Sequence, residues 1–225
     1  MKKLLFLLIS MVVVFASCKK DAEINEPLDF GYNYFPLKIG DSSIYIVKNI
    51  FWNDFDNTID TTNYFLCEYI ESATTNLSGD SLFRIERMKR DSEIEPWNLD
   101  SVWFALRTKN EAIRVENNYS YVKLVFPTTK DVTWNSNAHN HLGEKQCTLV
   151  DIANATVNGV VYNSAVFVDM ERFQSLINSD VETEIYVPNI GLVQVDIEHV
   201  YLEFNSISGA FEITSGYRYS QIRIR

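Results

Sequence analysis

The sequence has little cysteine, histidine, glycine or proline, and it has no excess of positive charge. Three cysteines and three histidines in 225 residues are too few for a disulfide scaffold or a metal protein with many ligands. Eight glycines and five prolines exclude collagen-like and low-complexity chains. A net charge of -10 excludes nucleic acid as the expected partner, because phosphates require clustered lysine and arginine. By contrast, 46% hydrophobic and 13% aromatic residues are too many for a disordered chain.

Long apolar runs are also scarce, and the one at the N-terminus carries a targeting signal. Met1-Lys2-Lys3 precedes an apolar run over 4–16, and the small residue Ser17 follows it. A basic start, a short apolar run and small residues at its end are typical of a cleaved secretory signal peptide. The run is shorter than the ~18–20 residues that span a bilayer. No later run reaches that length without a charge, so we expect no transmembrane helix.

The end of this signal indicates a lipid anchor. Ala16-Ser17-Cys18 resembles the lipobox of bacterial lipoproteins, in which the chain is cut before the cysteine and the cysteine is acylated. The resemblance implies a signal peptide over 1–17, lipidation of Cys18, and attachment to the membrane through the acyl chains. The junction Ser17-Cys18-Lys19-Lys20-Asp21 resembles outer-membrane lipoproteins of Bacteroidota. The alternative is an ordinary signal peptide with a chance cysteine.

The residues after the cysteine divide into a tether and one domain. Residues 18–33 are polar and acidic, so we predict a lipidated flexible tether there. Ordered structure is predicted from Tyr34, and no second linker interrupts residues 34–225. A single domain of this size forms an ample core.

Alternating apolar and polar residues predict strands throughout this domain. Asn158-Gly159 between two β-branched runs predicts a hairpin with a type I′ turn. Residues 171–177 favour one short helix, and residues 51–60 and 134–143 are expected to be loops. We therefore predict an all-β fold, a single antiparallel curved sheet, open or closed into a barrel.

Two further motifs resemble a family. The opening Tyr34-Phe35-Pro36-Leu37-Lys38-Ile39-Gly40 and the later Gly191-Leu192-Val193 are similar to segments of many uncharacterised Bacteroidota lipoproteins. The motifs cover a small part of the chain. The resemblance implies a β-rich outer-membrane lipoprotein, and it brings no known activity.

Few residues offer metal or disulfide chemistry. His139 and His141 are two apart, so on a strand both would point to one side and could bind zinc. A third ligand could be His199, Asp131 or Glu144. The alternative is a solvated polar loop, and we predict no metal or other cofactor.

Two cysteines remain once Cys18 is lipidated. A Cys67–Cys147 disulfide in an oxidising envelope would close a loop of ~80 residues and stabilise the fold by about 3–4 kcal/mol. A pair of buried free thiols is the alternative.

Other residues are candidates for surface contacts. Trp52, Trp97 and Trp134 lie in loop-like sequence and could contact a sugar or lipid, whereas Trp103 is expected in the core. Thr61, Ser81 and Ser101 each follow an aspartate, which resembles the O-glycosylation signal of Bacteroidota. That resemblance implies glycans at these positions, and coincidence in an Asp-rich chain is the alternative.

Catalytic motifs are missing. The sequence has no Gly-x-Ser-x-Gly elbow and no glycine-rich phosphate loop. Carboxylate pairs such as Glu93/Glu95 and Glu182/Glu184 are expected on exposed faces, not in a glycosidase site. We therefore predict a non-enzymatic envelope lipoprotein that binds a small hydrophobic or glycan ligand on the concave face of its sheet, or has a structural role. The alternatives are a hydrolase acting on envelope or dietary glycans and an assembly partner of an outer-membrane protein.

Overall fold

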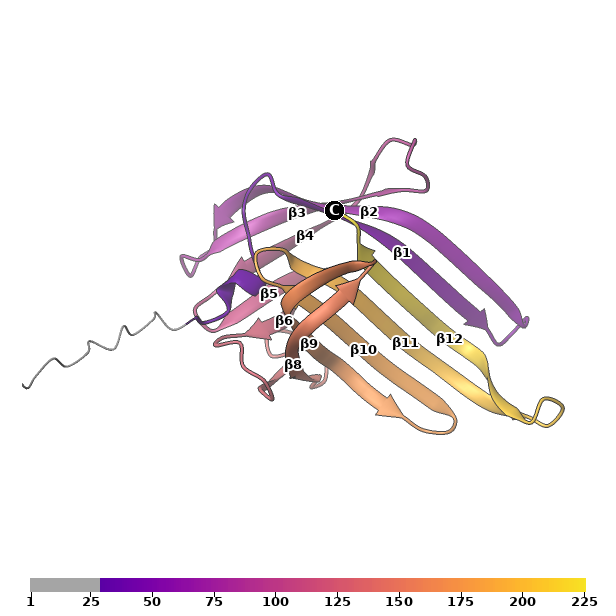
Figure 1. Cartoon of the computed structure of the whole chain (residues 1–225). Helices are drawn as coiled ribbons and strands as arrows, with labels where there is room; N and C mark the ends of the chain where they lie inside the picture. The colour runs from indigo at the N-terminus through magenta and orange to yellow at the C-terminus, as the bar shows by residue number, and fades with distance from the viewer. Residues whose placement is uncertain (1–28) are drawn as a thin grey trace, which may run out of the picture.

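The computed structural model describes residues 29–225, and all the strands in this range belong to one antiparallel sheet (Figure 1). A 3-10 helix, η2 (Tyr32–Tyr34), precedes the sheet. The strands are β1 (Ser42–Asn53), β2 (Thr58–Thr75), β3 (Ser81–Arg90), β4 (Asn98–Arg107), β5 (Glu111–Glu116), β6 (Tyr119–Val125), β7 (Thr133–Asn135), β8 (Gln146–Val157), β9 (Val160–Gln174), β10 (Asn178–Val187), β11 (Gly191–Asn205) and β12 (Ala210–Arg223). The predicted all-β class is confirmed. The predicted signal peptide and Cys18 lie outside the described residues.

The sheet is a meander that nearly closes into a barrel. Consecutive strands pair from β1 to β6 and from β7 to β12, and β1 also pairs with β12, with Tyr45 opposite Arg223. The two ends of the sheet, β6 and the short β7, approach each other. The Val122 amide donates to the Ser136 carbonyl at 2.8 Å, and the Trp134 indole N–H donates to the Val122 carbonyl at 2.9 Å. Sequence reasoning left an open sheet and a barrel as alternatives, and these contacts favour the barrel.

The β8–β9 hairpin has the predicted turn and bends over its neighbours. Asn158 and Gly159 have φ values of 48° and 76°, which a type I′ turn requires at both positions. Beyond the turn, Ala155 and Ala165 belong to one apolar cluster with Val193 of β11. This hairpin therefore covers part of the sheet's outer face, as Figure 1 shows for β8 and β9 in front of β10 and β11.

Three predictions about local structure are wrong. Residues 171–174 end β9 instead of forming a helix, because Glu171 pairs with Glu182 of β10. An isolated helix of seven residues is unstable in water, and the ladder with β10 supplies the hydrogen bonds instead. Within 51–60 only residues 54–57 form the turn between β1 and β2, and residues 133–135 form β7 inside a region expected to be a loop.

One end of the barrel is filled by the segment that enters it. Tyr34 and Phe35 are buried in the largest apolar cluster, together with Leu124 and Val168. Tyr32 lies 4.8 Å from the Phe126 ring, measured between ring centroids. Packing therefore begins before the expected tether boundary at residue 33. We call this the plugged end.

The opposite end carries the turns of the β1–β2, β3–β4, β9–β10 and β11–β12 hairpins, and we call it the hairpin end (Figure 1). Large apolar side chains at these turns are exposed. The exposed fractions are 97% for Phe55, 96% for Ile94, 74% for Leu176 and 95% for Ile207. We call these four residues the apolar tips. Among the described residues, no helix is long and apolar enough to cross a membrane.

Candidate functional site in the barrel interior

The barrel interior between the two ends is polar and lined by charged side chains. Strand alternation brings them there, because residues two apart point to the same face. On β10 this places Glu182, Glu184 and Tyr186 on the inner face, and Arg114 and Glu116 project from β5 across the interior. The expectation that Glu182 and Glu184 lie on an exposed face is wrong, since Glu184 is only 2% exposed.

Two cavities occupy this interior. One of about 450 Å³ lies toward the hairpin end, and one of about 380 Å³ lies toward the plugged end. Both are lined by Glu68, Arg114 and Leu192, so these residues separate the two spaces. The larger cavity is also lined by aromatic residues from several strands: Phe51, Tyr64, Trp103, Tyr217 and Tyr219.

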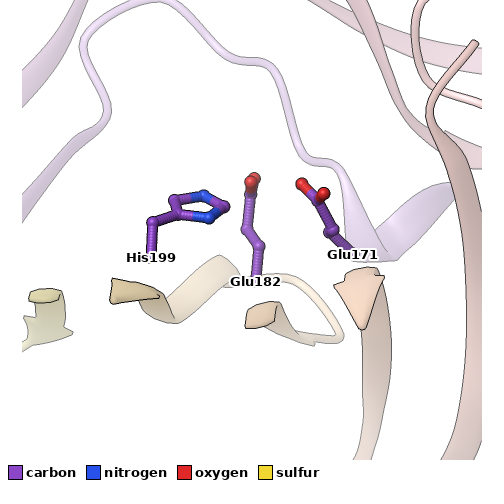
Figure 2. A group of neighbouring side chains, drawn as sticks. All are labelled: Glu171, Glu182 and His199. Atoms are coloured by element: carbon purple, nitrogen blue, oxygen red, sulfur yellow. The ribbon is translucent and has the colours of Figure 1, made fainter. Parts of the chain in front are cut away.

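A group of two carboxylates and one imidazole lies on three adjacent strands. Glu171 of β9, Glu182 of β10 and His199 of β11 each have a ligand atom within 4.8 Å of the others (Figure 2). The Nζ atom of Lys145 lies 2.5 Å from Glu182 Oε2 and 3.8 Å from Glu171 Oε2. His199 Nδ1 lies 2.8 Å from Asp180 Oδ1. The two glutamates therefore share the ammonium group of Lys145, and Asp180 contacts the imidazole.

A second, larger network begins at Glu68. One oxygen of this carboxylate, Oε1, accepts hydrogen bonds from Arg87 Nε at 3.0 Å and from Arg114 Nη2 at 2.8 Å. Their side chains are nearly buried, with exposed fractions of 11% for Glu68, 10% for Arg87 and 7% for Arg114. Buried charges require partners of opposite sign, and here one carboxylate serves two guanidinium groups.

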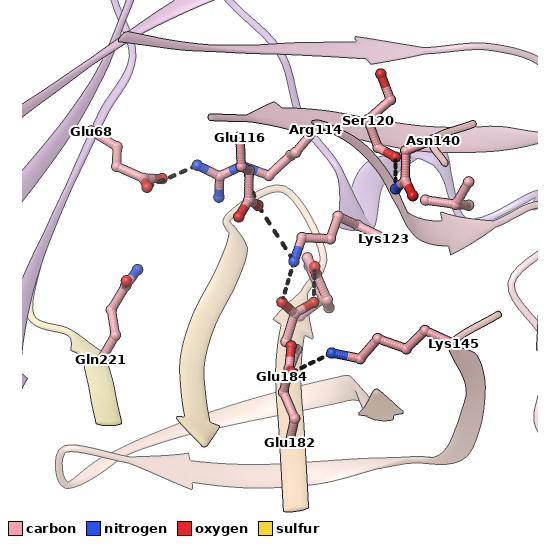
Figure 3. A network of polar contacts seen from close by, with 12 residues as sticks. Glu68, Arg114, Glu116, Ser120, Lys123, Asn140, Lys145, Glu182, Glu184 and Gln221 are labelled. Atoms are coloured by element: carbon pink, nitrogen blue, oxygen red, sulfur yellow. Dashed lines mark hydrogen bonds and ion pairs between the residues drawn. The ribbon is translucent and has the colours of Figure 1, made fainter. Parts of the chain in front are cut away.

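The network continues across the barrel to β10 (Figure 3). Glu116 lies 3.8 Å from Arg114 Nε and 3.4 Å from Lys123 Nζ, measured from its Oε1 atom. Lys123 Nζ donates to Glu184 Oε1 at 2.7 Å, and the Tyr186 hydroxyl donates to Glu184 Oε2 at 2.5 Å. The ion pairs therefore link β2, β5 and β6 on one wall with β10 on the other.

The pKa values reflect this pairing. Burial alone would raise the pKa of Glu68, but the adjacent Arg114 and Arg87 outweigh it and lower that pKa below its ordinary value. Burial would lower the pKa of Lys123, yet Glu116 and Glu184 raise it. Burial, reinforced by the Glu184 carboxylate, raises the pKa of Tyr186. Glu68 and Lys123 are therefore charged at neutral pH, and Tyr186 keeps its proton as a donor.

Aromatic rings complete the inner surface. The Arg87 guanidinium lies 3.5 Å from the centroid of the Trp103 ring, and that of Arg114 lies 4.9 Å from it. Both distances are in the range of cation–π contacts. Trp103, expected in the core, is half-buried: it packs against the largest apolar cluster and also lines the larger cavity.

The predicted histidine pair is not brought together with a third ligand. His139 Nε2 lies 2.7 Å from Glu111 Oε2, and the His141 ring lies 5.3 Å from that of Tyr119. Neither belongs to the group formed by His199, nor do the other suggested ligands, Asp131 and Glu144. These two histidines lie in the turns after β7, which corresponds to the polar-loop alternative.

The two described cysteines are free and buried. Cys67 is on β2 and Cys147 is on β8, at distant positions in the sheet order. Burial raises the pKa of the Cys147 thiol to about 11. The structure therefore shows the free-thiol alternative and no disulfide between them.

The surface candidates differ in their environments. Trp134 is half-buried and holds β7 to β6, so its role is structural. Trp97 lies under Arg90 at 4.3 Å, and Trp52 lies 5.5 Å from Arg218, in both cases from the cation to the ring centroid. Of the glycosylation candidates, Thr61 and Ser81 are exposed, and the Ser101 hydroxyl donates to Asp100 Oδ2 at 3.0 Å.

Comparison with known proteins adds little to this site. No protein-family model and no curated protein matches the chain. A protein of Bacteroides fragilis NCTC 9343, described as exported and of YmcC-like fold, is 12% identical over 88% of this chain and 99% of that chain, with a TM-score of 0.43. A protein of Parabacteroides distasonis ATCC 8503, described as a lipoprotein, is 9% identical over 88% and 98%, with a TM-score of 0.40. At these scores the likeness establishes neither a shared function nor a shared ligand.

We expect Glu68→Gln to lower the free energy of unfolding by about 3 kcal/mol at pH 7, because it leaves two buried guanidinium groups without their carboxylate. Chemical denaturation measures this loss. The matched control is Glu71→Gln, whose ion pair with Arg84 is exposed and screened by water, so we expect it to change the stability little.

The stabilisation that the Glu68 carboxylate provides depends on pH in a defined direction. The pKa of Glu68 is lower in the folded chain than its value of about 4.3 in the unfolded chain. The stabilisation is therefore complete above that value and disappears as the pH falls through the folded pKa. Equal stability of the wild type and Glu68→Gln at pH 7 would contradict the account.

Proposed function

We propose that this protein is a lipid-anchored protein of the cell envelope whose barrel interior binds one small, electrically neutral ligand rich in hydroxyl groups, such as a sugar. The observation that carries the proposal is the charge pairing inside the larger cavity. Glu68, Glu116 and Glu184 face Arg87, Arg114 and Lys123 within a few ångströms. A charged ligand would have to compete with these pairs, whereas hydroxyl groups can donate to and accept from them.

The size and the rings of the cavity support the same ligand class. A volume of about 450 Å³ lies in the range of about 300–1,000 Å³ found for small-molecule pockets. Trp103, Tyr217 and Tyr219 provide flat apolar faces beside the polar groups. A sugar ring has an apolar face and a polar rim, so it matches a wall that alternates between the two.

The carboxyl group of Glu68 supports binding without hydrolysis at its position. A glycosidase requires one carboxylic acid whose pKa is raised so that it can donate a proton. In the barrel interior the pKa of Glu68 is lowered by its two arginines. This carboxylate is therefore a fixed acceptor, unsuited to act as a general acid.

We expect neutral sugars to bind to the purified protein, with Trp103→Ala and Tyr217→Ala each weakening the binding by about tenfold, since one buried aromatic contact contributes about 1.4 kcal/mol. Calorimetric titration with glucose, N-acetylglucosamine and cellobiose measures this effect. Trp97→Ala is the matched control, because Trp97 packs under Arg90 and does not line the cavity.

Glucuronic acid serves as the charged competitor in the same titration. We expect it to bind more weakly than glucose. No binding of any of the neutral sugars, or stronger binding of the acid, would contradict the proposed ligand class.

The proposal of a lipid anchor is based on the sequence Ala16-Ser17-Cys18. We expect Cys18→Ala to move the protein from the membrane fraction to the soluble fraction of cells, because the acyl chains supply the attachment. Immunoblotting of the two fractions measures it, with Cys67→Ala as control. Retention of Cys18→Ala in the membrane fraction would contradict the lipoprotein assignment.

The apolar tips favour a second candidate function, assembly with another envelope protein. The hairpins that carry Phe55, Leu176 and Ile207 are neighbours in the sheet order, so their turns project from one end of the barrel (Figure 1). Exposed apolar groups gathered on one surface are typical of interaction sites. The helix η2 lies at the plugged end, so an acyl anchor that precedes it in the chain would attach to the barrel at the end opposite the tips.

Charge around the tips favours a protein partner over a lipid surface. Asp54 and Asp56 flank Phe55, and Glu203 and Glu212 lie beside the β11–β12 turn, all of them exposed. Carboxylates repel anionic lipid and attract lysine and arginine. The occupant we propose is therefore a protein with an apolar pocket surrounded by basic residues.

We expect photo-crosslinkers placed at Phe55 and at Ile207 in cells to capture the same protein, because both tips belong to one surface. A crosslinker at Leu77, which is fully exposed on the β2–β3 turn at the plugged end, is the matched control. Leu176→Ser should lower the yield from both tips. Adducts only with lipid or with a second copy of this chain, or equal capture from Leu77, would contradict the proposal.

A further inference from the structure

The inner wall of the barrel carries a group of side chains that the proposed ligand site does not explain. We propose that Glu171, Glu182 and His199 form a binding site for one divalent transition metal ion of the zinc type. The site does not depend on the sugar-binding proposal, because only Glu182 is shared with the lining of the larger cavity. Among the described residues, these three are the ones whose donor atoms meet closely enough to share an ion.

The three ligands come from three neighbouring strands of the sheet. β9, β10 and β11 are adjacent, with Glu182 opposite Glu171 and Asp180 opposite His199 in the register. Their donor atoms lie within 4.8 Å of one another. An ion about 2 Å from each atom would draw them slightly closer, which needs side-chain rotation and no movement of the backbone. Figure 2 shows the three side chains rising from the sheet toward the same space.

The histidine has the support that metal-binding imidazoles have in proteins. Its Nδ1 atom is 2.8 Å from Asp180 Oδ1, and the other oxygen of Asp180 accepts a hydrogen bond from Asn178 Nδ2 at 2.8 Å. A carboxylate on one imidazole nitrogen fixes the ring and directs the other nitrogen to a metal. Nε2 is therefore the atom of His199 left for an ion.

The ammonium group of Lys145 places a positive charge next to the two carboxylates of the proposed site. Its Nζ atom is within ion-pair distance of both Glu182 and Glu171. A metal ion between these carboxylates would have to displace the ammonium, whose side chain is 25% exposed and flexible. Lys145 and the metal therefore compete, and this competition distinguishes a metal site from a purely structural ion pair.

The donor set indicates the kind of ion. One imidazole and two carboxylates suit zinc and its neighbours in the first transition series, whereas calcium takes six to eight oxygen ligands. Three protein ligands leave a coordination position for water.

The test is a calorimetric titration of the full chain with Zn²⁺ after treatment with a chelator. We expect one ion per chain. His199→Ala and Glu171→Gln should each weaken binding by about tenfold or more, as losses at metal sites usually do. Lys145→Met should strengthen binding by about tenfold, because the competing charge is removed. His139→Ala is the matched control, since His139 also faces a carboxylate but lies outside the group.

Circular dichroism of each variant verifies folding, and Co²⁺ provides a second readout through its visible absorption in a site of low symmetry. Absence of Zn²⁺ binding would overturn the proposal. So would binding that His199→Ala leaves unchanged, or binding that Lys145→Met weakens, because in that case the ion lies elsewhere.

Discussion

The ion pairs that Glu68 makes with Arg87 and Arg114 are the interaction on which the interior of this barrel depends. Each charge is nearly removed from water, so each would be very costly alone. Together they allow two arginines to remain inside the sheet, and Arg114 passes the charge pairing on to Glu116, Lys123 and Glu184. This series of ion pairs thereby links opposite walls of the barrel through polar side chains.

This arrangement explains why the interior holds cavities. At the plugged end, Tyr34, Phe35 and the apolar side chains around them fill part of the space and leave only the smaller cavity. Toward the hairpin end, long charged side chains are held in fixed directions by their partners, and they cannot collapse together as apolar groups would. The result is a cavity with a polar but nearly neutral wall. That wall is the basis for expecting a neutral ligand with hydroxyl groups.

Much of the fold could be predicted from the sequence, because strand alternation and turn residues are local signals. Asn158-Gly159 specified its turn, and the all-β class followed from period-two patterns. The end of β9 was missed because Phe173, Leu176 and Ile177 also fit a helical spacing over a short window, and only pairing with β10 decides between the two. The short β7 was missed because its pairing with β8 and its contacts with β6 are set by tertiary structure.

The candidate site was harder to predict than the fold. The resemblance of Ala16-Ser17-Cys18 to a lipobox points to Cys18 from local sequence alone. The interior network, by contrast, joins residues from 68 to 184 whose proximity depends on barrel closure. A local signal did exist on β10. Glu184 and Glu182 lie two and four residues before the buried Tyr186, so on a strand all three point to the same face. Sequence reasoning assigned the two glutamates to an exposed face because an acidic chain usually places them there. His139 and His141, chosen for spacing alone, lie apart from the group that His199 forms on the sheet.

The most direct test of the central interaction is a double-mutant cycle between Glu68 and Arg114, using Glu68→Gln, Arg114→Met and the double variant. Chemical denaturation of the four proteins gives the coupling free energy of the pair. We predict a favourable coupling above about 1.5 kcal/mol, because both charged side chains are nearly buried. A coupling within about 0.3 kcal/mol of zero would show that the two residues stabilise the fold independently, and it would contradict the account.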